Sequence, residues 1–206
     1  MSLGAECGRV VFAVHGIRTN GEWLSDLSDI LLGAGVRLAT FRYGYFGIWR
    51  FLSPSARRDV ADAFVAWFRD RTREMESNAC RPSVVAHSFG TIVVTSALLE
   101  NSDLKVDRLI LSGAIVPRDF DWQLLIGRGQ VRHVENDVGT RDVWAGIVGR
   151  CIMGMGPSGR VGFHETTCGC RNRCYPRYRH CDFVRRVHIE KEWLPLLAGD
   201  AVGCDE

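Results

Sequence analysis

The stretch from Pro82 to Thr91 constrains the fold most, because a short apolar run stops at Ser88 and sequence compatible with a helix follows at once. A strand that delivers a serine into a tight turn before a helix needs small residues two positions before and after it, so that strand and helix can approach closely. Ala86 and Gly90 stand at those positions. The stretch therefore predicts a strand, a strained turn and a helix. The simpler alternative is a serine that only caps the helix.

Apolar runs alternate with segments of helical periodicity along most of the chain. The runs that predict strands are 9–15, 36–43, the run before Ser88, 107–113 and 130–135, and the helix-like segments are 23–31, 56–77, 92–99, 122–126 and 139–148. A short sixth strand can lie only within 149–178, the stretch 44–52 predicts a loop, and 183–197 has helical spacing that Pro195 interrupts. We therefore expect an α/β fold: a doubly wound, mostly parallel sheet of about six strands with helices on both faces. Ligands of such sheets bind beyond the carboxyl ends of the strands, near the switch point.

Composition indicates a soluble globular chain. Its 206 residues, 46% hydrophobic and 24% charged, suit a single domain over 1–206. The net charge of +2 is too small to indicate a nucleic-acid partner, and no apolar run is long enough for a membrane span. The first residues lack the pattern of a signal peptide, so we expect a cytoplasmic protein whose eight cysteines are not in disulfides.

Three segments resemble the α/β-hydrolase superfamily, specifically its small bacterial lipase-like or esterase-like members with little or no lid domain. They are 15–23, the turn segment 86–91 and the tail segment 180–183. Ala86 departs from the Gly-x-Ser-x-Gly pattern of the family. The resemblance implies a minimal α/β-hydrolase fold, Ser88 as the nucleophile, no cofactor, and an acid and then a histidine later in the chain.

The acid should follow the fifth strand, where Asp137 and Asp142 are the candidates. The family places its acid in a Gly-x-x-Asp turn, which matches the four residues from Gly139 to Asp142. We therefore expect Asp142 to be the acid and keep Asp137 in reserve. An N-cap role explains an aspartate at position 142 equally well, and both roles are compatible.

For the base, the resemblance favours His180, because the family places its histidine in a loop before a terminal helix. His188 is the reserve. Arg179 and Cys181 stand where the family usually has glycine and serine. His87 and His133 suit packing or hydrogen-bonding roles, and His15 suits the shaping of its own loop.

An oxyanion hole needs two backbone N–H donors aimed at the position where negative charge develops. The geometry of the turn supplies one donor from the residue after the nucleophile, which is Phe89. The second should come from the first loop, where Gly16 permits close approach of the backbone. Ile17 is the expected donor and Arg18 the alternative.

These residues predict a serine hydrolase that cleaves the ester, thioester or amide of a small acyl substrate through an acyl-enzyme. The alternative is a non-catalytic binding or interaction domain with the same fold. No motif indicates the substrate or the oligomeric state. A third interpretation is a phosphate-binding or nucleic-acid-binding patch, although a solvated basic loop explains its residues as well. The patch consists of Arg171, Arg173, Arg177, Arg179, Arg185 and Arg186, with Tyr175 and Tyr178 between them.

Four cysteines and a histidine gather in one glycine-rich and arginine-rich segment: Cys168, Cys170, Cys174, Cys181 and His164. Thiolates and imidazole are good zinc ligands, but structural zinc sites pair their cysteines in two knuckles, and this spacing does not. We expect free thiols in a surface loop, and no metal.

Overall fold

A single layer of parallel strands organises the chain. The computed structural model describes residues 8–16, 22–44, 47–75, 80–164 and 168–199, and within them one six-stranded sheet has the order β2-β1-β3-β4-β5-β6 with every neighbouring pair parallel. The strands are β1 Val10–Val14, β2 Arg37–Phe41, β3 Ser83–His87, β4 Val106–Ser112, β5 Val131–Gly139 and β6 Cys170–Tyr175. The doubly wound parallel sheet predicted from the sequence is confirmed.

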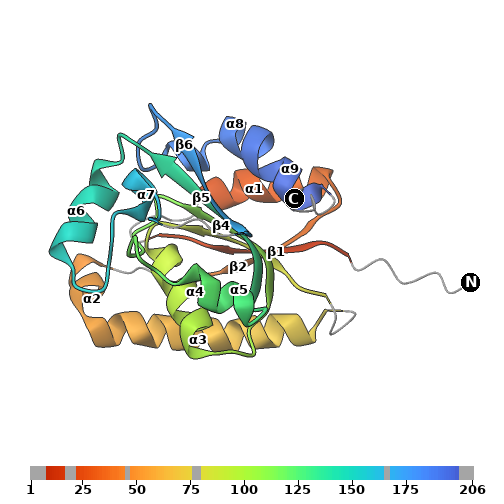
Figure 1. The fold of residues 1–206 in the computed structure, drawn as a ribbon. Helices are drawn as coiled ribbons and strands as arrows, with labels where there is room; N and C mark the ends of the chain where they lie inside the picture. The colour runs from red at the N-terminus through yellow and green to blue at the C-terminus, as the bar shows by residue number, and fades with distance from the viewer. Residues whose placement is uncertain (1–7, 17–21, 45–46, 76–79, 165–167, 200–206) are drawn as a thin grey trace, which may run out of the picture.

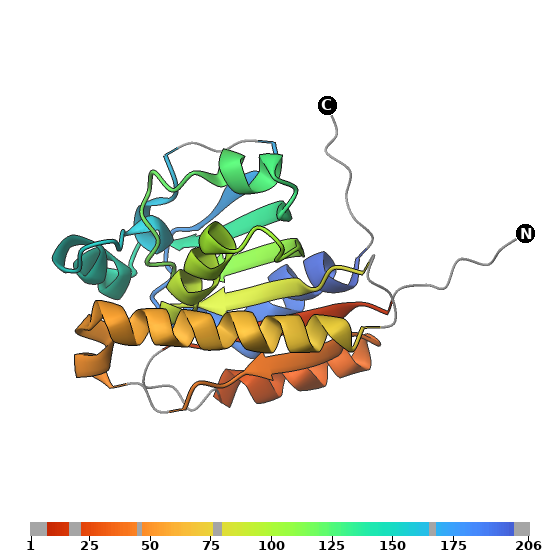
Figure 2. The same cartoon turned by 90° about the horizontal axis from the view of Figure 1, so that it is seen from below.

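Helices cover both faces of this sheet (Figure 1). α1, α8 and α9 lie on one face, whereas α3, α4 and α5 lie on the other, and Figure 2 shows α3 extending along its face. The bounds are α1 Glu22–Gly33, α2 Ile48–Leu52, α3 Pro54–Arg73, α4 Phe89–Glu100, α5 Trp122–Gly127, α6 Val143–Cys151, α7 Ser158–Val161, α8 Arg186–His188 and α9 Leu194–Ala198. A 3₁₀ turn at Asp182–Val184 and a π-helical turn at Ile189–Trp193 complete the tail.

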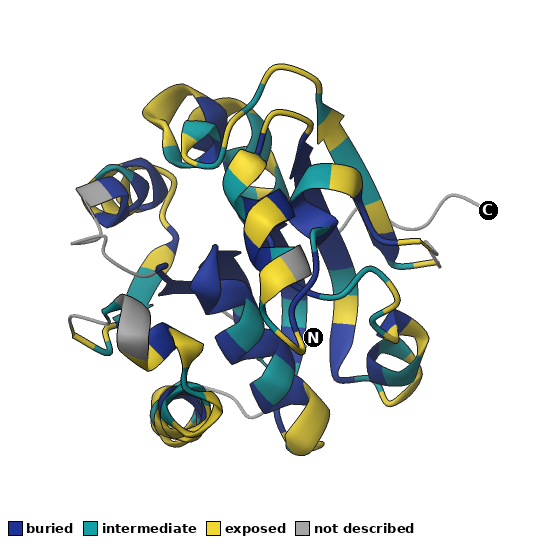
Figure 3. Cartoon of the chain, turned by 90° about the vertical axis from the view of Figure 1, so that its left-hand side faces the viewer, coloured by how far each residue is buried: buried dark blue, intermediate teal, exposed yellow. Residues whose placement is uncertain are grey.

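The core is divided by the sheet because successive strand residues point to opposite faces. In β1, Val11 and Ala13 pack in the cluster under α1 and the tail, while Phe12 and Val14 pack in the cluster under α3 and α4. All four are buried. Burial on both faces explains why the strand is a continuous apolar run rather than an alternating one. Figure 3 shows buried residues concentrated in the strands and on the helix surfaces turned toward them.

The switch point of the sheet lies between β1 and β3. From β1 the chain crosses to β2 on one side, and it then returns past β1 to β3 and continues in the other direction. The carboxyl ends of β1 and β3 lead directly into Gly16 and Ser88. This is where the ligand of a doubly wound sheet is expected.

Several segments differ from the sequence-based prediction. The stretch 44–52, predicted as a loop, contains the helix α2. The fifth strand continues to Gly139 instead of ending at Glu135, so Asp137 lies within β5. The tail 183–197 is divided into 3₁₀, α and π turns rather than one interrupted helix. Among the described residues, no helix is long and apolar enough to cross a membrane.

Candidate active site

The turn between β3 and α4 is built around Ser88. Ser88 has φ 55° and ψ −122°, and it is the one non-glycine residue with positive φ in the described part of the chain. A side chain in this conformation is strained and persists only where its surroundings hold it. Here the Ser88 N–H donates to the Ser112 carbonyl at 3.0 Å, and the Thr91 hydroxyl donates to the Ser88 carbonyl at 2.6 Å.

The glycines around this turn are required by close packing. A Cβ atom on Gly90 would lie 2.5 Å from the Val14 carbonyl oxygen, at the end of β1. A Cβ on Gly16 would lie 2.8 Å from the Cβ of Ser88. The loop after β1 therefore passes directly beside the Ser88 side chain, and α4 packs tightly against the end of β1.

His180 lies between Ser88 and Asp142. The His180 Nε2 atom is 2.9 Å from Ser88 Oγ, and its Nδ1 atom is 2.8 Å from Asp142 Oδ2. A carboxylate only accepts hydrogen bonds, so Nδ1 carries the proton and the unprotonated Nε2 can accept from the serine hydroxyl. His180 comes from the loop after β6, and Asp142 from the turn between β5 and α6. Both Ser88 and Asp142 are buried.

Asp142 also caps α6. Its Oδ1 atom accepts the Ala145 N–H at 2.9 Å, while Oδ2 faces His180. One carboxylate therefore caps the helix and also contacts His180. The cap fixes the carboxylate in one orientation, because one oxygen is bound to the backbone of the helix.

The two reserve residues contact each other. Asp137 Oδ2 accepts from His188 Nε2 at 3.1 Å and from Trp193 Nε1 at 2.8 Å, and Asp137 Oδ1 accepts from Arg173 Nε at 2.8 Å. Asp137, His188 and Trp193 are buried. The Asp137–His188 pair anchors the tail to β5. Trp193 and Arg173 also donate to the Asp137 carboxylate, which the spacing of the sequence did not indicate.

His87 packs against His180. Their ring centroids are 4.9 Å apart, and His87 Nδ1 lies 3.2 Å from the Ser112 hydroxyl oxygen. Burial is the main cause that holds the pKa of His87 well below its usual value, and repulsion from His180, when that ring is protonated, lowers it further. His87 is therefore a neutral ring beside His180, in agreement with the packing role expected for it.

Tyr43 holds the first loop in place, and no pattern in the sequence singles it out. Its hydroxyl donates to the His15 carbonyl at 2.8 Å, and its ring stacks on the His15 ring with centroids 4.4 Å apart. The His15 Nδ1–H donates to the Gly16 carbonyl at 2.7 Å. Burial lowers the pKa of His15 and raises that of Tyr43, so both side chains are neutral.

The two expected oxyanion donors can be placed only in part. Phe89 is the first residue of the 12-residue helix α4, so its N–H lies at the positive end of the helix dipole. Ile17 and its alternative Arg18 lie outside the described residues. Gly16, which precedes them, is adjacent to Ser88.

The cysteine segment differs from the expected loop. Cys170 and Cys174 lie in β6, paired in register with Val134 and Val138 of β5. Together with Cys181 they are free thiols, and burial raises the pKa of Cys170 to about 12, so its thiol stays protonated. Within the described ranges no three His, Cys, Asp or Glu side chains are grouped so as to hold a metal ion.

Cys80 is disulfide-bonded, so the expectation that the cysteines are outside disulfides is wrong for this residue. That expectation assumed a reducing compartment, in which cysteine thiols stay free. Free thiols are therefore not the state of every cysteine in the chain.

Carboxylates pair with several arginines of the proposed basic patch. Arg171 lies 2.6 Å from Glu135, Arg185 lies 2.8 Å from Asp182, and Arg186 lies 2.8 Å from Glu190. Arg173 is bound to Asp137. These pairs neutralise much of the charge that suggested a phosphate or nucleic-acid surface.

The comparisons with known proteins find a likeness of fold. No family model and no curated protein matches the chain. An uncharacterized protein from Bacillus cereus matches with a TM-score of 0.65 and 14% identity over 96% of this chain, which spans 62% of that protein. A cold-adapted esterase from an Arctic intertidal metagenomic library matches with a TM-score of 0.58 and 14% identity, over 93% of this chain and 83% of the esterase.

A protein of unknown function from Agrobacterium tumefaciens, named as an α/β hydrolase, matches with a TM-score of 0.56 and 14% identity over 92% of this chain and 84% of its own. The sheet order, the helices on both faces and these matches agree. The chain has the α/β-hydrolase fold, as the resemblance in its sequence implied.

Proposed function

We propose that the protein is a serine hydrolase that cleaves a carboxylic ester through an acyl-enzyme, with Ser88 as nucleophile, His180 as base and Asp142 as the acid that orients it. The observation that carries this proposal is the continuous contact from Ser88 Oγ through both ring nitrogens of His180 to Asp142. Structures named as esterases share the fold, which supports hydrolysis as the reaction.

The geometry suits two successive acyl transfers. His180 Nε2 takes the proton of Ser88 as Oγ attacks the substrate carbonyl, and Asp142 stabilises the imidazolium that forms. The N–H groups of Phe89 and Ile17 would bind the oxyanion of the tetrahedral intermediate. His180 then returns the proton to the leaving alcohol, and a water molecule deprotonated by His180 releases the acid and restores Ser88. The reaction needs no cofactor.

A fluorophosphonate probe, which reacts with activated serines, tests the proposal. We expect the parent protein to be labelled and to turn over short-chain activated esters, and Ser88→Ala to lose both properties. Ser55→Ala, an exposed serine of α3, is the matched control and should behave as the parent. If Ser88→Ala is labelled as strongly as the parent, another residue is the nucleophile. A folded parent without labelling or turnover would favour the non-catalytic alternative.

A further inference from the structure

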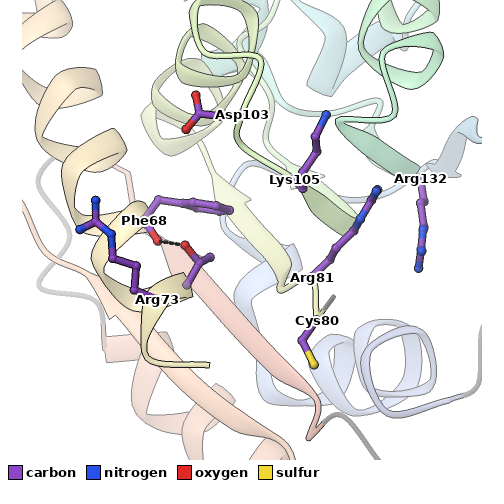
Figure 4. Close-up of a pocket in the computed structure, with 8 residues that line it drawn as sticks. Phe68, Arg73, Cys80, Arg81, Asp103, Lys105 and Arg132 are labelled. Carbon is purple, nitrogen blue, oxygen red and sulfur yellow. Dashed lines mark hydrogen bonds between the residues drawn. The ribbon is translucent and has the colours of Figure 1, made fainter. Parts of the chain in front are cut away.

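A cavity of about 530 Å³ lies at the amino-terminal end of the strands, whereas Ser88 follows the carboxyl end of β3. Figure 4 shows its lining side chains. Its basic lining residues are Arg73, Arg81, Lys105 and Arg132. Arg81 and Lys105 stand just before β3 and β4, Arg132 is near the start of β5, and Arg73 ends α3. Since the amino ends of parallel strands meet at one edge, four separate elements bring positive charge to one place.

Among the lining residues that the structure describes, four are basic and one, Asp103, is acidic. Arg69, which is outside the lining, binds both Asp103 oxygens at 2.8 Å. Arg73 and Arg132 pair with Asp70 and Asp107 at 2.6 and 3.0 Å. Both arginine side chains are more than half exposed, so these two pairs hold them only weakly.

Arg81 and Lys105 are positioned by groups without net charge. Arg81 Nη1 donates to the Gly129 carbonyl at 2.9 Å, and Lys105 Nζ donates to the Arg128 carbonyl at 3.2 Å. A guanidinium has five N–H donors and an ammonium has three, so these contacts orient both groups and use few of their donors. The positive charge of both side chains remains.

Capping of α5 explains only part of this arrangement. The two carbonyls follow α5, and basic side chains commonly bind the last carbonyls of a helix. Capping does not account for Arg73 and Arg132, which come from α3 and β5, nor for the hollow between the four side chains.

We propose that this cavity binds a small molecule that carries phosphate with at least two negative charges. A tetrahedral phosphate accepts hydrogen bonds from several directions, which suits donors on separate walls, and arginine binds phosphate in bidentate geometry. The volume lies in the range of small-molecule sites. Phe68, which is buried at the cavity, supplies an apolar wall for the rest of the ligand. The proposal is independent of the proposed hydrolase.

Calorimetric titration with inorganic pyrophosphate at constant ionic strength tests this site. We expect saturable binding of one pyrophosphate per chain, weakened at least about tenfold by Lys105→Gln and by Arg81→Gln. Lys191→Gln and Arg58→Gln remove the same charges from exposed positions outside the cavity and should bind as the parent does. Ser88→Ala should also bind normally, which separates this test from that of the hydrolase.

Three outcomes would overturn the proposal. They are no saturable binding up to about 10 mM pyrophosphate, equal weakening by the control variants, and tighter binding of citrate than of pyrophosphate. Thermal unfolding of each variant monitors folding, because Arg81→Gln loses the contact to Gly129. If Arg81→Gln does not fold, Lys105→Gln decides the question. The Lys105 side chain donates to an exposed carbonyl, so its loss should not prevent folding.

Discussion

Gly113 leaves the space that the His180 ring occupies: a Cβ atom on Gly113 would lie 2.8 Å from both Cε1 and Nδ1 of that ring. Gly113 follows β4 and has φ +53°, a conformation that costs other residues about 1–2 kcal/mol. The residue is therefore constrained twice, by its backbone and by the ring. The ring contact, but not the backbone strain, bears on the proposed chemistry.

Gly113→Ala should lower the rate of ester turnover by about 10²-fold or more, because a small displacement of the base breaks its alignment with Ser88. Gly35→Ala is the matched control, since Gly35 also has positive φ (+71°) but a Cβ atom on it would meet no other atom within 4 Å. Gly113→Ala should lose at least as much stability in urea unfolding as Gly35→Ala, and only Gly113→Ala should lose activity. Equal rates for the two would show that His180 tolerates displacement.

Asp142→Asn separates the capping role from the proposed catalytic one. Asparagine caps helices as well as aspartate does, so the free energy of unfolding should change by less than about 1 kcal/mol. Ester turnover should fall by roughly 10³–10⁴-fold, because a neutral amide no longer stabilises the imidazolium and favours the wrong tautomer of His180. Steady-state kinetics with an activated ester measures the loss.

The control for Asp142→Asn is Asp121→Asn. Asp121 caps α5 with the same geometry, its Oδ1 accepting the Leu124 N–H at 2.8 Å, and the described residues show no histidine bound to it. It should keep full activity. If both substitutions have small and equal effects on ester turnover, Asp142 caps the helix and has no catalytic role.

The fold could be predicted from the sequence because its central strands are buried on both faces and therefore appear as continuous apolar runs. β6 could not be delimited in the same way. Its sequence Cys-Arg-Asn-Arg-Cys-Tyr is largely polar, and only Cys170 in it is buried, because the strand lies at the edge of the sheet. Its hydrogen bonds to β5, rather than its side chains, define it.

The extent of β5 was missed for an electrostatic reason. Glu135 and Asp137 would normally end a buried strand, yet both are buried in β5. Arg171 binds Glu135 and Arg173 binds Asp137 from the neighbouring strand, and these partners are 36 residues away in the chain. Sequence spacing indicates charges but not which distant charge neutralises them.

The candidate site could be located from local patterns where local geometry is decisive. The small residues around Ser88 are needed by close packing, and the Gly-x-x-Asp turn places Asp142 directly before α6. The roles of Tyr43 and Gly113 depend on contacts between segments far apart in the chain, so no local pattern could indicate them.

Stability should fall in mild acid because of His87. Its pKa is well below the ordinary 6.5 in the folded state owing to burial, so below about pH 6.5 the unfolded chain binds more protons than the folded one. The free energy of unfolding should therefore decrease as the pH falls, by up to about 1.4 kcal/mol per pH unit for this group. Urea unfolding between pH 5 and pH 8 measures the slope.

His87→Gln should make this slope shallower, because the variant has no proton to take up at that position. The remaining slope comes from His15 and His133, whose pKa values burial also lowers. An unaltered slope in His87→Gln would mean that His87 is accessible to protons in the folded protein.

Asp137 and His188 should matter for stability, whereas His180 should matter for turnover. Asp137→Asn removes the carboxylate nearest to Arg173 and leaves the more distant Glu135 as its buried counter-charge. It should cost about 3 kcal/mol of unfolding free energy. Trp193→Phe removes one N–H donor to the same carboxylate and should cost about 1–3 kcal/mol. At a temperature where each variant is folded, both should retain most of the ester turnover proposed for the parent, per folded molecule.

His180→Ala should show the opposite pattern, because the His180 side chain is partly exposed and its hydrogen bonds go to Ser88 and Asp142. Its acylation rate should fall far below that of His188→Ala, measured as the rate of fluorophosphonate labelling and corrected for the folded fraction. His188→Ala should instead unfold at lower urea, since it empties a buried site among Tyr175, Phe183 and Trp193. If His188→Ala is acylated more slowly than His180→Ala, His188 is the base, and Asp137, which contacts it, is the acid.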